Sequence, residues 1–244
     1  MNISWYFCET VRINWPTIQT LDMPKIFKTE DGSDTLFDPH YGEYYHSIHG
    51  SVQESNHVFI ESGLKTIKNQ DIIIFEVGFG TGLNAYLTAL EANKTTKIIQ
   101  YFAIEKHPLL KKDWENLNYP NMTADHNTGL FQQLHLAEWE NKVRISLNFN
   151  LQKIEADLTE FKYHSLPGFD LIYFDAFSPV SQPELWQTEI FNQLFRQCNP
   201  GGRIVTYCAK GSVRRALIEA GFMVERLPGP PGKREMLRGS KSAL

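Results

Sequence analysis

The hydrophobic residues of the chain follow two alternating patterns. Short, continuous apolar runs predict strands buried on both faces, and they cover residues 71–78, 97–105, 143–154, 169–177 and 203–209. Between them, apolar residues three or four positions apart predict helices at residues 55–67, 82–93, 107–117, 183–202 and 211–222. Strands that alternate with helices in this way form a mainly parallel sheet covered on both faces.

The two ends of the chain depart from this alternation. Residues 223–227 and 233–239 predict an antiparallel hairpin that closes the sheet. Residues 1 to about 70 are rich in aromatic residues and turn formers and show no clear period. We therefore expect an α/β, Rossmann-like core over residues 66–244 and an N-terminal extension, residues 1–65, packed on it.

Length and composition limit the class of protein. The 244 residues, 42% of them hydrophobic, suffice for one substantial core. The longest apolar runs are far shorter than the roughly 20 residues of a membrane span, and the chain does not begin with a secretory signal. Three scattered cysteines without a CxxC pair predict neither a disulfide framework nor a zinc ribbon. We expect a cytoplasmic protein that does not contact a membrane.

The histidines do not change this picture. His40, His46, His49 and His57 are close together in the sequence. The chain has no HExxH pair, and no carboxylate lies at a convincing ligand spacing. We expect these histidines to line a pocket or lie on the surface, and we expect no metal site.

The charge of the chain is unevenly distributed. The net charge of the chain is −4. Residues 201–244 contain nine basic and three acidic side chains and so carry +6, which leaves −10 on residues 1–200. A basic C-terminal fifth is suited to phosphates, because lysine and arginine displace condensed counterions. Solvated helix and strand faces would give the same composition, so the pattern leaves both interpretations open.

The stretch "FEVGFGTGLN" contains glycines at alternate positions, Gly78, Gly80 and Gly82, directly after an apolar strand. Glycines at a sharp strand-to-helix turn let a ligand approach the backbone closely. The dinucleotide pattern GxGxxG needs its third glycine where this chain has Leu83, and a P-loop needs a GK[ST] that is missing. The GxGxG spacing is typical of Rossmann-like S-adenosylmethionine-dependent methyltransferases.

Three carboxylates accompany the glycines at the ends of predicted strands. Glu76 precedes the glycines, and Glu105 ends the second strand, where a carboxylate would accept hydrogen bonds from ribose hydroxyls. Asp175 closes the apolar strand "LIYFD", a position where a carboxylate costs free energy unless something binds it. The turn Asp-Ala-Phe-Ser-Pro resembles the Asp/Asn-Pro-Pro-aromatic turn of enzymes that methylate exocyclic amines.

Longer blocks resemble one family. "FEVGFGTGLN", "IEKHPL", "DAFSPVSQPELW", "NPGGRIVTYCAKGSVRRALIEAGF" and "GPPGKREMLRG" are similar to the methyltransferase domain of MnmC, the bifunctional enzyme that completes 5-methylaminomethyl-2-thiouridine at the tRNA wobble position. "YYHSIHGSVQESNHVF" is similar to a pattern upstream of that domain. The resemblance runs from about residue 38 to residue 239, and the "DAFSP" and "GKREM" blocks are its most specific parts.

The resemblance implies a class I S-adenosylmethionine-dependent methyltransferase that adds the methyl group to the amine of 5-aminomethyl-2-thiouridine. Asp175 would be catalytic, orienting the amine. The cofactor would contact Glu76, Gly78, Phe79, Gly80, Thr81, Gly82, Asn84, Glu105, Lys106, Ile154 and Asp175. The anticodon stem-loop of tRNA would contact Tyr44, Phe177, Pro179, Lys210, Arg214, Arg215, Lys233 and Arg234, with Tyr41 a further candidate for base stacking.

The chain departs from the family pattern in two places. MnmC proteins carry a second, flavin-dependent oxidoreductase domain, and no second glycine-rich βαβ unit follows here. We therefore expect a stand-alone methyltransferase that acts on the aminomethyl form, with a separate enzyme supplying that group. Where the family has Gly-Asp after the third strand, this chain has Gln152-Lys153-Ile154, with Asp157 slightly later. Which residue meets the adenine stays open.

Three other functions compete with this interpretation. A polyamine aminopropyltransferase shares the fold and cofactor type, but it has a second aspartate near the fourth strand. A non-catalytic RNA-binding module would not need Glu105 and Asp175 beside the glycines. A nicotinamide-dependent oxidoreductase is disfavoured by the glycine spacing. Methylation or aminopropylation of a small amine stays the main alternative.

Overall fold

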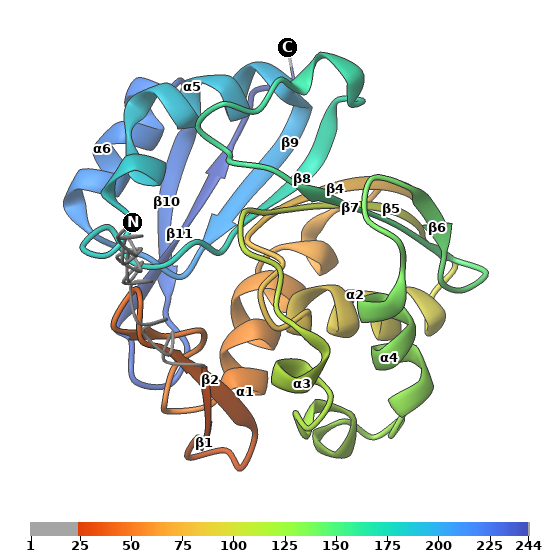
Figure 1. Cartoon of the computed structure of the whole chain (residues 1–244). Coiled ribbons are helices and arrows are strands. Elements are labelled where there is room, and N and C mark those ends of the chain that lie inside the picture. Colours follow the sequence, from red (N-terminus) through yellow and green to blue (C-terminus); the bar gives the residue numbers. More distant parts are fainter. Residues whose placement is uncertain (1–23, 244) are drawn as a thin grey trace, which may run out of the picture.

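The protein was analysed as a computed structural model, which describes residues 24–243 (Figure 1). Its centre is an eight-stranded sheet with the strand order β10-β11-β9-β8-β4-β5-β7-β6. In chain order the strands are β4 (Asp71–Val77), β5 (Ile98–Glu105), β6 (Lys142–Arg144), β7 (Phe149–Glu155), β8 (Phe169–Phe174), β9 (Cys198–Thr206), β10 (Met223–Pro228) and β11 (Glu235–Ser240). The five strands from β9 to β7 are mutually parallel, and the strands at both ends are antiparallel.

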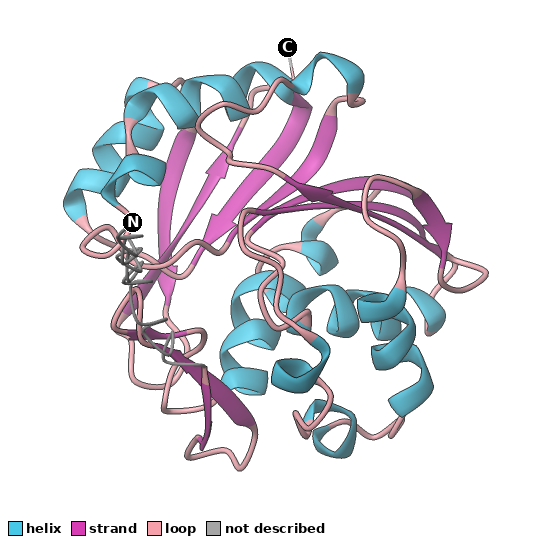
Figure 2. Cartoon of the chain, viewed as in Figure 1, coloured by secondary structure: helices cyan, strands magenta, loops and turns pink. Residues whose placement is uncertain are grey.

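Helices cover both faces of this sheet, so two apolar cores form (Figures 1 and 2). On one face lie α2 (Leu83–Asn93), α3 (Lys111–Trp114) and α4 (Thr128–Leu136); on the other lie α5 (Thr188–Gln197) and α6 (Gly211–Glu219). Each central strand contributes alternate side chains to the two cores, as Ile74 and Phe75 of β4 do. The predicted class I, mainly parallel α/β fold with its C-terminal antiparallel hairpin is confirmed.

The described part of the N-terminal extension contains a small sheet that the sequence did not predict and a helical segment that it predicted in part. β1 (Lys25–Lys28), β2 (Asp34–Asp38) and β3 (Glu43–Tyr44) form a small antiparallel sheet. α1 (Ser51–Ser55) continues into a π-helical turn over Asn56–Glu61 and a 3₁₀ turn over Leu64–Thr66. Side chains from β2 and these turns, including Leu36 and Phe59, join the core beside α2. The boundary at residue 65 stays a prediction, and residues 1–23, with Cys8, lie outside the described part.

The predicted strand 143–154 is wrong, because the structure has two antiparallel strands there, β6 and β7. The turn between them is fixed by contacts with the end of α2. The hydroxyl of Ser146 donates to the amide oxygen of Asn93 at 2.7 Å, and the amide of Asn148 donates to two backbone carbonyls, those of Ala92 and Thr95. Such tertiary bonds leave no periodic signal in the sequence.

Three helix predictions also need correction. The helix predicted at 55–67 begins at Ser51, and the helix predicted at 183–202 is a 3₁₀ turn followed by α5, which ends at Gln197. β9 starts directly after it, so the Pro-Gly-Gly segment lies in a strand. The helix predicted at 107–117 shrinks to α3, and α4 was not predicted at all.

Candidate active site

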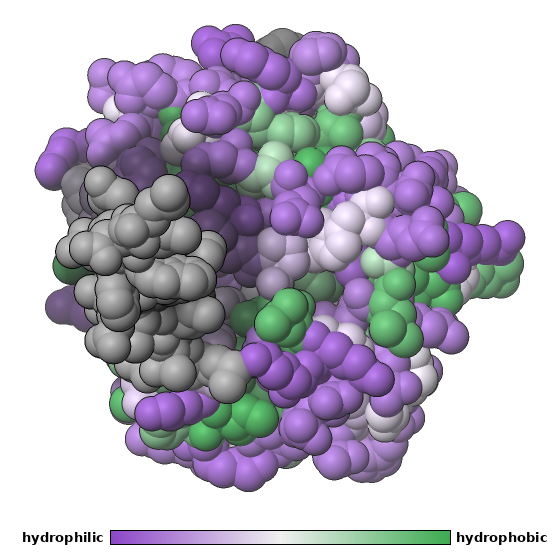
Figure 3. All heavy atoms as spheres, in the orientation of Figure 1, coloured by the Kyte–Doolittle hydropathy of each residue, from purple (hydrophilic) through white to green (hydrophobic). Residues whose placement is uncertain are grey.

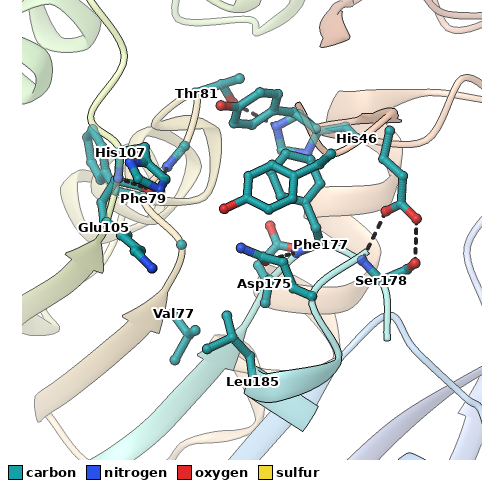
Figure 4. Close-up of a pocket in the computed structure, with 18 of the residues that line it drawn as sticks. His46, Val77, Phe79, Thr81, Glu105, His107, Asp175, Phe177, Ser178 and Leu185 are labelled. Atoms are coloured by element: carbon teal, nitrogen blue, oxygen red, sulfur yellow. Dashed lines mark hydrogen bonds between the residues drawn. The ribbon is translucent and has the colours of Figure 1, made fainter. Parts of the chain in front are cut away.

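A cavity of about 350 Å³ opens at the carboxyl ends of β4, β5, β7 and β8, beneath the small N-terminal sheet. This is where ligands bind in open α/β sheets. Figure 4 shows Phe79, Glu105 and His107 on one side of the cavity and Asp175, Phe177 and Ser178 on the other. The face of the molecule in Figure 3 is mainly hydrophilic and recessed near its centre, with apolar side chains only in small groups.

The glycine motif forms one edge of the cavity, and each of its glycines has a positive φ. The values are 87° for Gly78, 45° for Gly80 and 71° for Gly82, a region that disfavours other residues. A Cβ atom on Gly78 would lie 2.9 Å from the carbonyl oxygen of Asp175, and one on Gly80 would lie 3.0 Å from the ring of Tyr45. The loop therefore requires glycine for conformation as well as for space.

Gly82 has a different place from the other two. It precedes α2 in a left-handed conformation, and a Cβ atom there would meet the ring of His135 at 2.9 Å. Gly78, Phe79, Gly80 and Thr81 line the cavity, whereas Gly82 and Glu76 do not. Gly82 thus shapes the turn into α2 from outside the cavity.

Glu105 fixes the glycine loop to the end of β5. Its carboxylate accepts a hydrogen bond from the backbone N–H of Gly80 at 3.0 Å and another from that of His107 at 2.8 Å. The same carboxylate lines the cavity. A carboxylate has about four lone-pair positions, so two bonds to the protein leave acceptor capacity for a pair of hydroxyl groups.

After β7, the chain presents Asp157 to the cavity. Its carboxylate forms an ion pair with Lys106 at 2.7 Å and accepts two hydrogen bonds from Thr159. Although partial burial raises the pKa of Asp157, the bonds from Lys106 and Thr159 outweigh it and hold the pKa at about 2. Ile154 is buried in the core and is not among the residues that line the cavity, and its expected contact with the cofactor stays a prediction.

Glu76 is buried beneath the glycine loop. Its side chain is fully buried, and neither oxygen reaches hydrogen-bond geometry with another described residue. Burial raises the pKa of Glu76 well above its usual range, and the nearby Asp175 adds to this, while Asn84 and Tyr101 lie close enough to oppose it. Glu76 is fully enclosed beneath the loop, and its expected contact with the cofactor stays a prediction.

Asp175 lies at the carboxyl end of β8, where its backbone carbonyl abuts Gly78. The amide nitrogen of Asn84 in α2 donates to its carboxylate at 2.7 Å. Burial raises the pKa of Asp175 to about 7, and the negative charge of Glu54 adds to this; the Asn84 hydrogen bond and the positive charge of Lys233 oppose it. Asp175 is therefore a fixed, partly exposed carboxylate that changes its charge near neutral pH.

Aromatic rings form the wall of the cavity next to Asp175. Phe177 stacks on Tyr41 with ring centres 4.6 Å apart and contacts the edge of Tyr45 at 4.9 Å. Glu43 holds the following turn, because its carboxylate accepts hydrogen bonds from the hydroxyl and the backbone N–H of Ser178. Tyr44 also lines the cavity, whereas Pro179 does not. The wall thus offers flat aromatic surfaces beside the carboxylate of Asp175.

The segment from the end of β3 through α1 contributes Tyr45, His46 and Glu54 to the cavity; His46 was expected to line a pocket or lie on the surface, and the motifs did not single out the other two. His46 is buried and bonds the hydroxyl of Thr81 at 2.7 Å, which ties this segment to the glycine loop. Burial lowers the pKa of His46 to about 4, so its ring is neutral at physiological pH. Tyr45 and Glu54 line the cavity as well.

The predicted tRNA-binding residues occupy two different environments. Lys210, Arg215 and Arg234 are exposed, and Arg214 is half-buried, at the start of α6 and in the loop between β10 and β11. Lys233 instead lines the cavity, where its ammonium forms an ion pair with buried Glu54. The structure therefore separates Lys233 from the other four.

No group of three or more metal-ligating side chains is placed to hold an ion among residues 24–243. His49 instead contacts Glu30, and His57 contacts the carbonyl oxygen of Pro228. Within the same range no helix is both long and apolar enough to cross a bilayer.

Comparison with known proteins now bears on this geometry. Residues 121–242 match the profile of a family described as S-adenosyl-L-methionine-dependent methyltransferase. The matched half includes β7, β8 and the Asp175 turn. The chain belongs to this methyltransferase family. A methyltransferase of this family uses S-adenosylmethionine, and the glycine loop and the Glu105 carboxylate fit such a ligand.

Proteins whose names specify a reaction are similar in sequence to most of this methyltransferase. The tRNA 5-methylaminomethyl-2-thiouridine biosynthesis bifunctional protein MnmC from Aromatoleum aromaticum is 32% identical over 90% of the chain, and its counterpart from Campylobacter hominis is 32% identical over 83%. The chain spans about a third of the length of these relatives. The crystal structure of MnmC2 from Aquifex aeolicus superimposes with a TM-score of 0.72 and 26% identity, over 90% of this chain and 70% of that one.

Proposed function

We propose that this protein transfers the methyl group of S-adenosylmethionine to the amine of 5-aminomethyl-2-thiouridine at the wobble position of tRNA. The observation that carries the proposal is the place of Asp175. Its carboxylate, fixed by Asn84, stands between the glycine loop and an aromatic wall. The names of the MnmC relatives support the choice of substrate.

The residues on the glycine-loop side fit the cofactor. Gly78 and Gly80 leave room for close approach to the backbone, Glu105 would accept the ribose hydroxyls, and Asp157 with Lys106 would border the adenine. When bound, S-adenosylmethionine supplies an electrophilic methyl group on a positively charged sulfur. The positive φ values of the loop are ones that glycine adopts without strain.

The residues on the opposite side would position the substrate. Asp175 would accept a hydrogen bond from the amine and so aim its lone pair at the methyl carbon. Because burial raises the pKa of Asp175 to about 7, the same carboxylate is also able to take a proton from an incoming ammonium group. The Tyr41–Phe177 stack, with Tyr44 beside it, would hold the splayed wobble base.

The exposed cations near α6 would contact the tRNA backbone. Lys210, Arg215 and Arg234 are exposed and Arg214 is half-buried, and all four lie outside the cavity, where they are available for phosphates. A tRNA substrate places the protein in the cytoplasm. The aminomethyl group itself would come from another enzyme or domain. Both statements stay predictions.

Label transfer tests the proposal. The protein is incubated with methyl-labelled S-adenosylmethionine and with tRNA from cells that lack this methylation step, in parallel with fully modified tRNA and with polyamines. We expect label only in the unmethylated tRNA. Equal labelling of both tRNAs would show that the amine at the wobble position is not the acceptor. Labelling of polyamines instead would favour the small-amine alternative.

A further inference from the structure

Lys233 has an environment unlike that of a phosphate-binding lysine. Its side chain is 30% exposed, and its ammonium is held by the carboxylate of Glu54, whose other oxygen accepts a hydrogen bond from the backbone N–H of Ser47 at 2.8 Å. The same ammonium lies over the ring of Tyr207, 3.9 Å from its centre. These contacts fix a positive charge inside the cavity.

The charge of Lys233 acts on the groups around the proposed amine site. Titratable groups face it from four elements: Glu54 of α1, Asp175 after β8, Tyr207 and Cys208 after β9, and His46 after β3. Lys233 lowers the pKa of both Asp175 and His46. Glu54 and Lys233 both line the cavity, and at Asp175 and His46 the negative charge of Glu54 acts more strongly than the positive charge of Lys233. Lys233 therefore offsets a buried negative charge that would otherwise attract a cation into the cavity.

The proposed reaction needs the amine in its neutral form, with a free lone pair on nitrogen. The nitrogen lone pair forms the new bond to the methyl carbon, while the electrons of the breaking carbon–sulfur bond stay on sulfur. The nitrogen then carries the positive charge and loses one proton to water or to a carboxylate. An ammonium group has no lone pair, so any feature that disfavours it at the reacting position raises the reactive fraction.

We propose that Lys233 is a positioning and specificity-determining residue that repels the ammonium form of the substrate and so keeps the aminomethyl group neutral in the cavity. This inference rests on the proposed function, because it presupposes an amine acceptor. It also reassigns Lys233 from the tRNA backbone to the reacting end of the cavity, and it explains why a buried carboxylate holds this lysine in place.

The pH profile of single-turnover methyl transfer tests the inference, with tRNA carrying the aminomethyl group and saturating S-adenosylmethionine. Lys233→Met removes a positive charge near the amine, so the pKa of the bound amine should rise. The acidic limb of the rate profile should therefore move to higher pH by about one unit. The rate should fall about tenfold at pH 7 and return to within about twofold of wild type by pH 9.5. Lys233→Arg, which keeps the charge, should retain the wild-type profile.

Two further variants keep the test decisive. Glu54→Gln combined with Lys233→Met removes both charges of the ion pair, so the acidic limb of the rate profile should return to the wild-type position or move below it. Lys65→Met removes a lysine from an exposed ion pair with Glu61, outside the cavity, and should leave the profile unchanged. Binding of S-adenosylmethionine, measured by calorimetry, should be the same in all variants and so reports that each one is folded.

The possible outcomes separate the inference from the function on which it rests. A uniformly reduced rate with an unmoved midpoint would overturn the inference and leave the function intact. So would a change confined to the KM for tRNA that disappears at high salt, since this would make Lys233 a phosphate contact. A wild-type protein that labels no aminomethyl tRNA at any pH would overturn both.

Discussion

Single residues fix the glycine loop in the conformation that a ligand needs. Gly78 has a φ of 87°, and a Cβ atom there would come within 2.9 Å of a backbone oxygen that has little freedom to move. We therefore expect Gly78→Ala to weaken S-adenosylmethionine binding by about tenfold or more, because left-handed backbone costs about 1–2 kcal/mol for alanine even before the clash. Isothermal titration calorimetry measures the effect.

Gly129→Ala is the matched control. Gly129 lies in α4, where the nearest heavy atom would be 3.7 Å from a new Cβ atom and alanine favours the helix. This variant should bind S-adenosylmethionine like the wild type. Equal affinities in Gly78→Ala and Gly129→Ala would contradict the account of the loop.

Asp175 makes stability depend on pH in a predictable direction. Burial raises its pKa to about 7 in the folded protein, above its ordinary value of 3.8. A carboxyl group with a raised pKa contributes most to the free energy of unfolding at a pH below its pKa in the unfolded protein. That contribution is lost as the pH rises through its pKa in the folded protein. Without ligand, the melting temperature of Asp175→Asn should therefore rise relative to the wild type between pH 4 and pH 8.

The exposed Asp71 provides the comparison for that experiment. Asp71→Asn should follow the wild-type melting curve across the same pH range. If Asp175→Asn also stays parallel to the wild type, the carboxyl group of Asp175 does not titrate near neutrality in the folded protein.

For the site residues, the positions predicted from the sequence motifs match the positions in the structure only in part. A strand, a glycine run and a helix sufficed to place Gly78, Gly80 and Asp175 at the cavity, because strand ends meet at one edge of a parallel sheet. His46 was expected only to line a pocket or lie on the surface, and Glu54 was not singled out, since their segment has no periodicity and their partners are distant in the sequence. The catalytic or binding roles of all these residues stay predictions.

At the scale of elements, buried parallel strands were the most predictable feature. The apolar runs at β4, β5 and β8 mark strands whose both faces are covered. The turn between β6 and β7 and the start of β9 were mispredicted, because tertiary hydrogen bonds decide them. Gly201 within β9, for example, donates to the carbonyl oxygens of Lys241 and Ser242 after β11.

The junction between α5 and β9 depends on a residue near the end of the chain. The ammonium of Lys241 donates to the carbonyl oxygens of Phe195 and Cys198 at 2.8 and 2.7 Å, which the end of a helix would otherwise leave unpaired. Lys241→Met should lower the free energy of unfolding by about 1.5–3 kcal/mol. Denaturant titration measures this loss.

Lys142 is a suitable control for that variant, because it is an exposed lysine at the opposite edge of the sheet. Lys142→Met should change the unfolding free energy little. Binding of S-adenosylmethionine by Lys241→Met should stay at the wild-type level, since the junction lies outside the cavity. An unchanged stability would mean that water replaces the ammonium without cost.

At the scale of the whole molecule, the charge distribution suits a polyanion. The chain as a whole carries −4, but exposed cations gather near the start of α6. Binding of tRNA should therefore weaken steeply as salt increases. Replacing Lys210, Arg214 and Arg215 together by glutamine should reduce the slope of log Kd against log salt by up to about three, in filter-binding or fluorescence titrations.

A slope that stays unchanged in this triple variant would contradict the proposed tRNA surface. Methyl transfer at low salt and saturating tRNA should nevertheless persist in the variant, since none of the three side chains lines the cavity. This separates binding of the tRNA backbone from the chemistry at Asp175.

We propose that the protein methylates the wobble aminomethyl group in the site that Asp175 and the glycine loop form. The most direct measurement is nucleoside mass spectrometry of tRNA from cells lacking this step, after incubation with S-adenosylmethionine and either the wild type or Asp175→Ala. We expect the wild type to move the 5-aminomethyl-2-thiouridine peak up by one methylene, and Asp175→Ala to bind the cofactor but leave the peak in place. An unmoved peak with the wild type, or equal conversion by both proteins, would contradict this proposal.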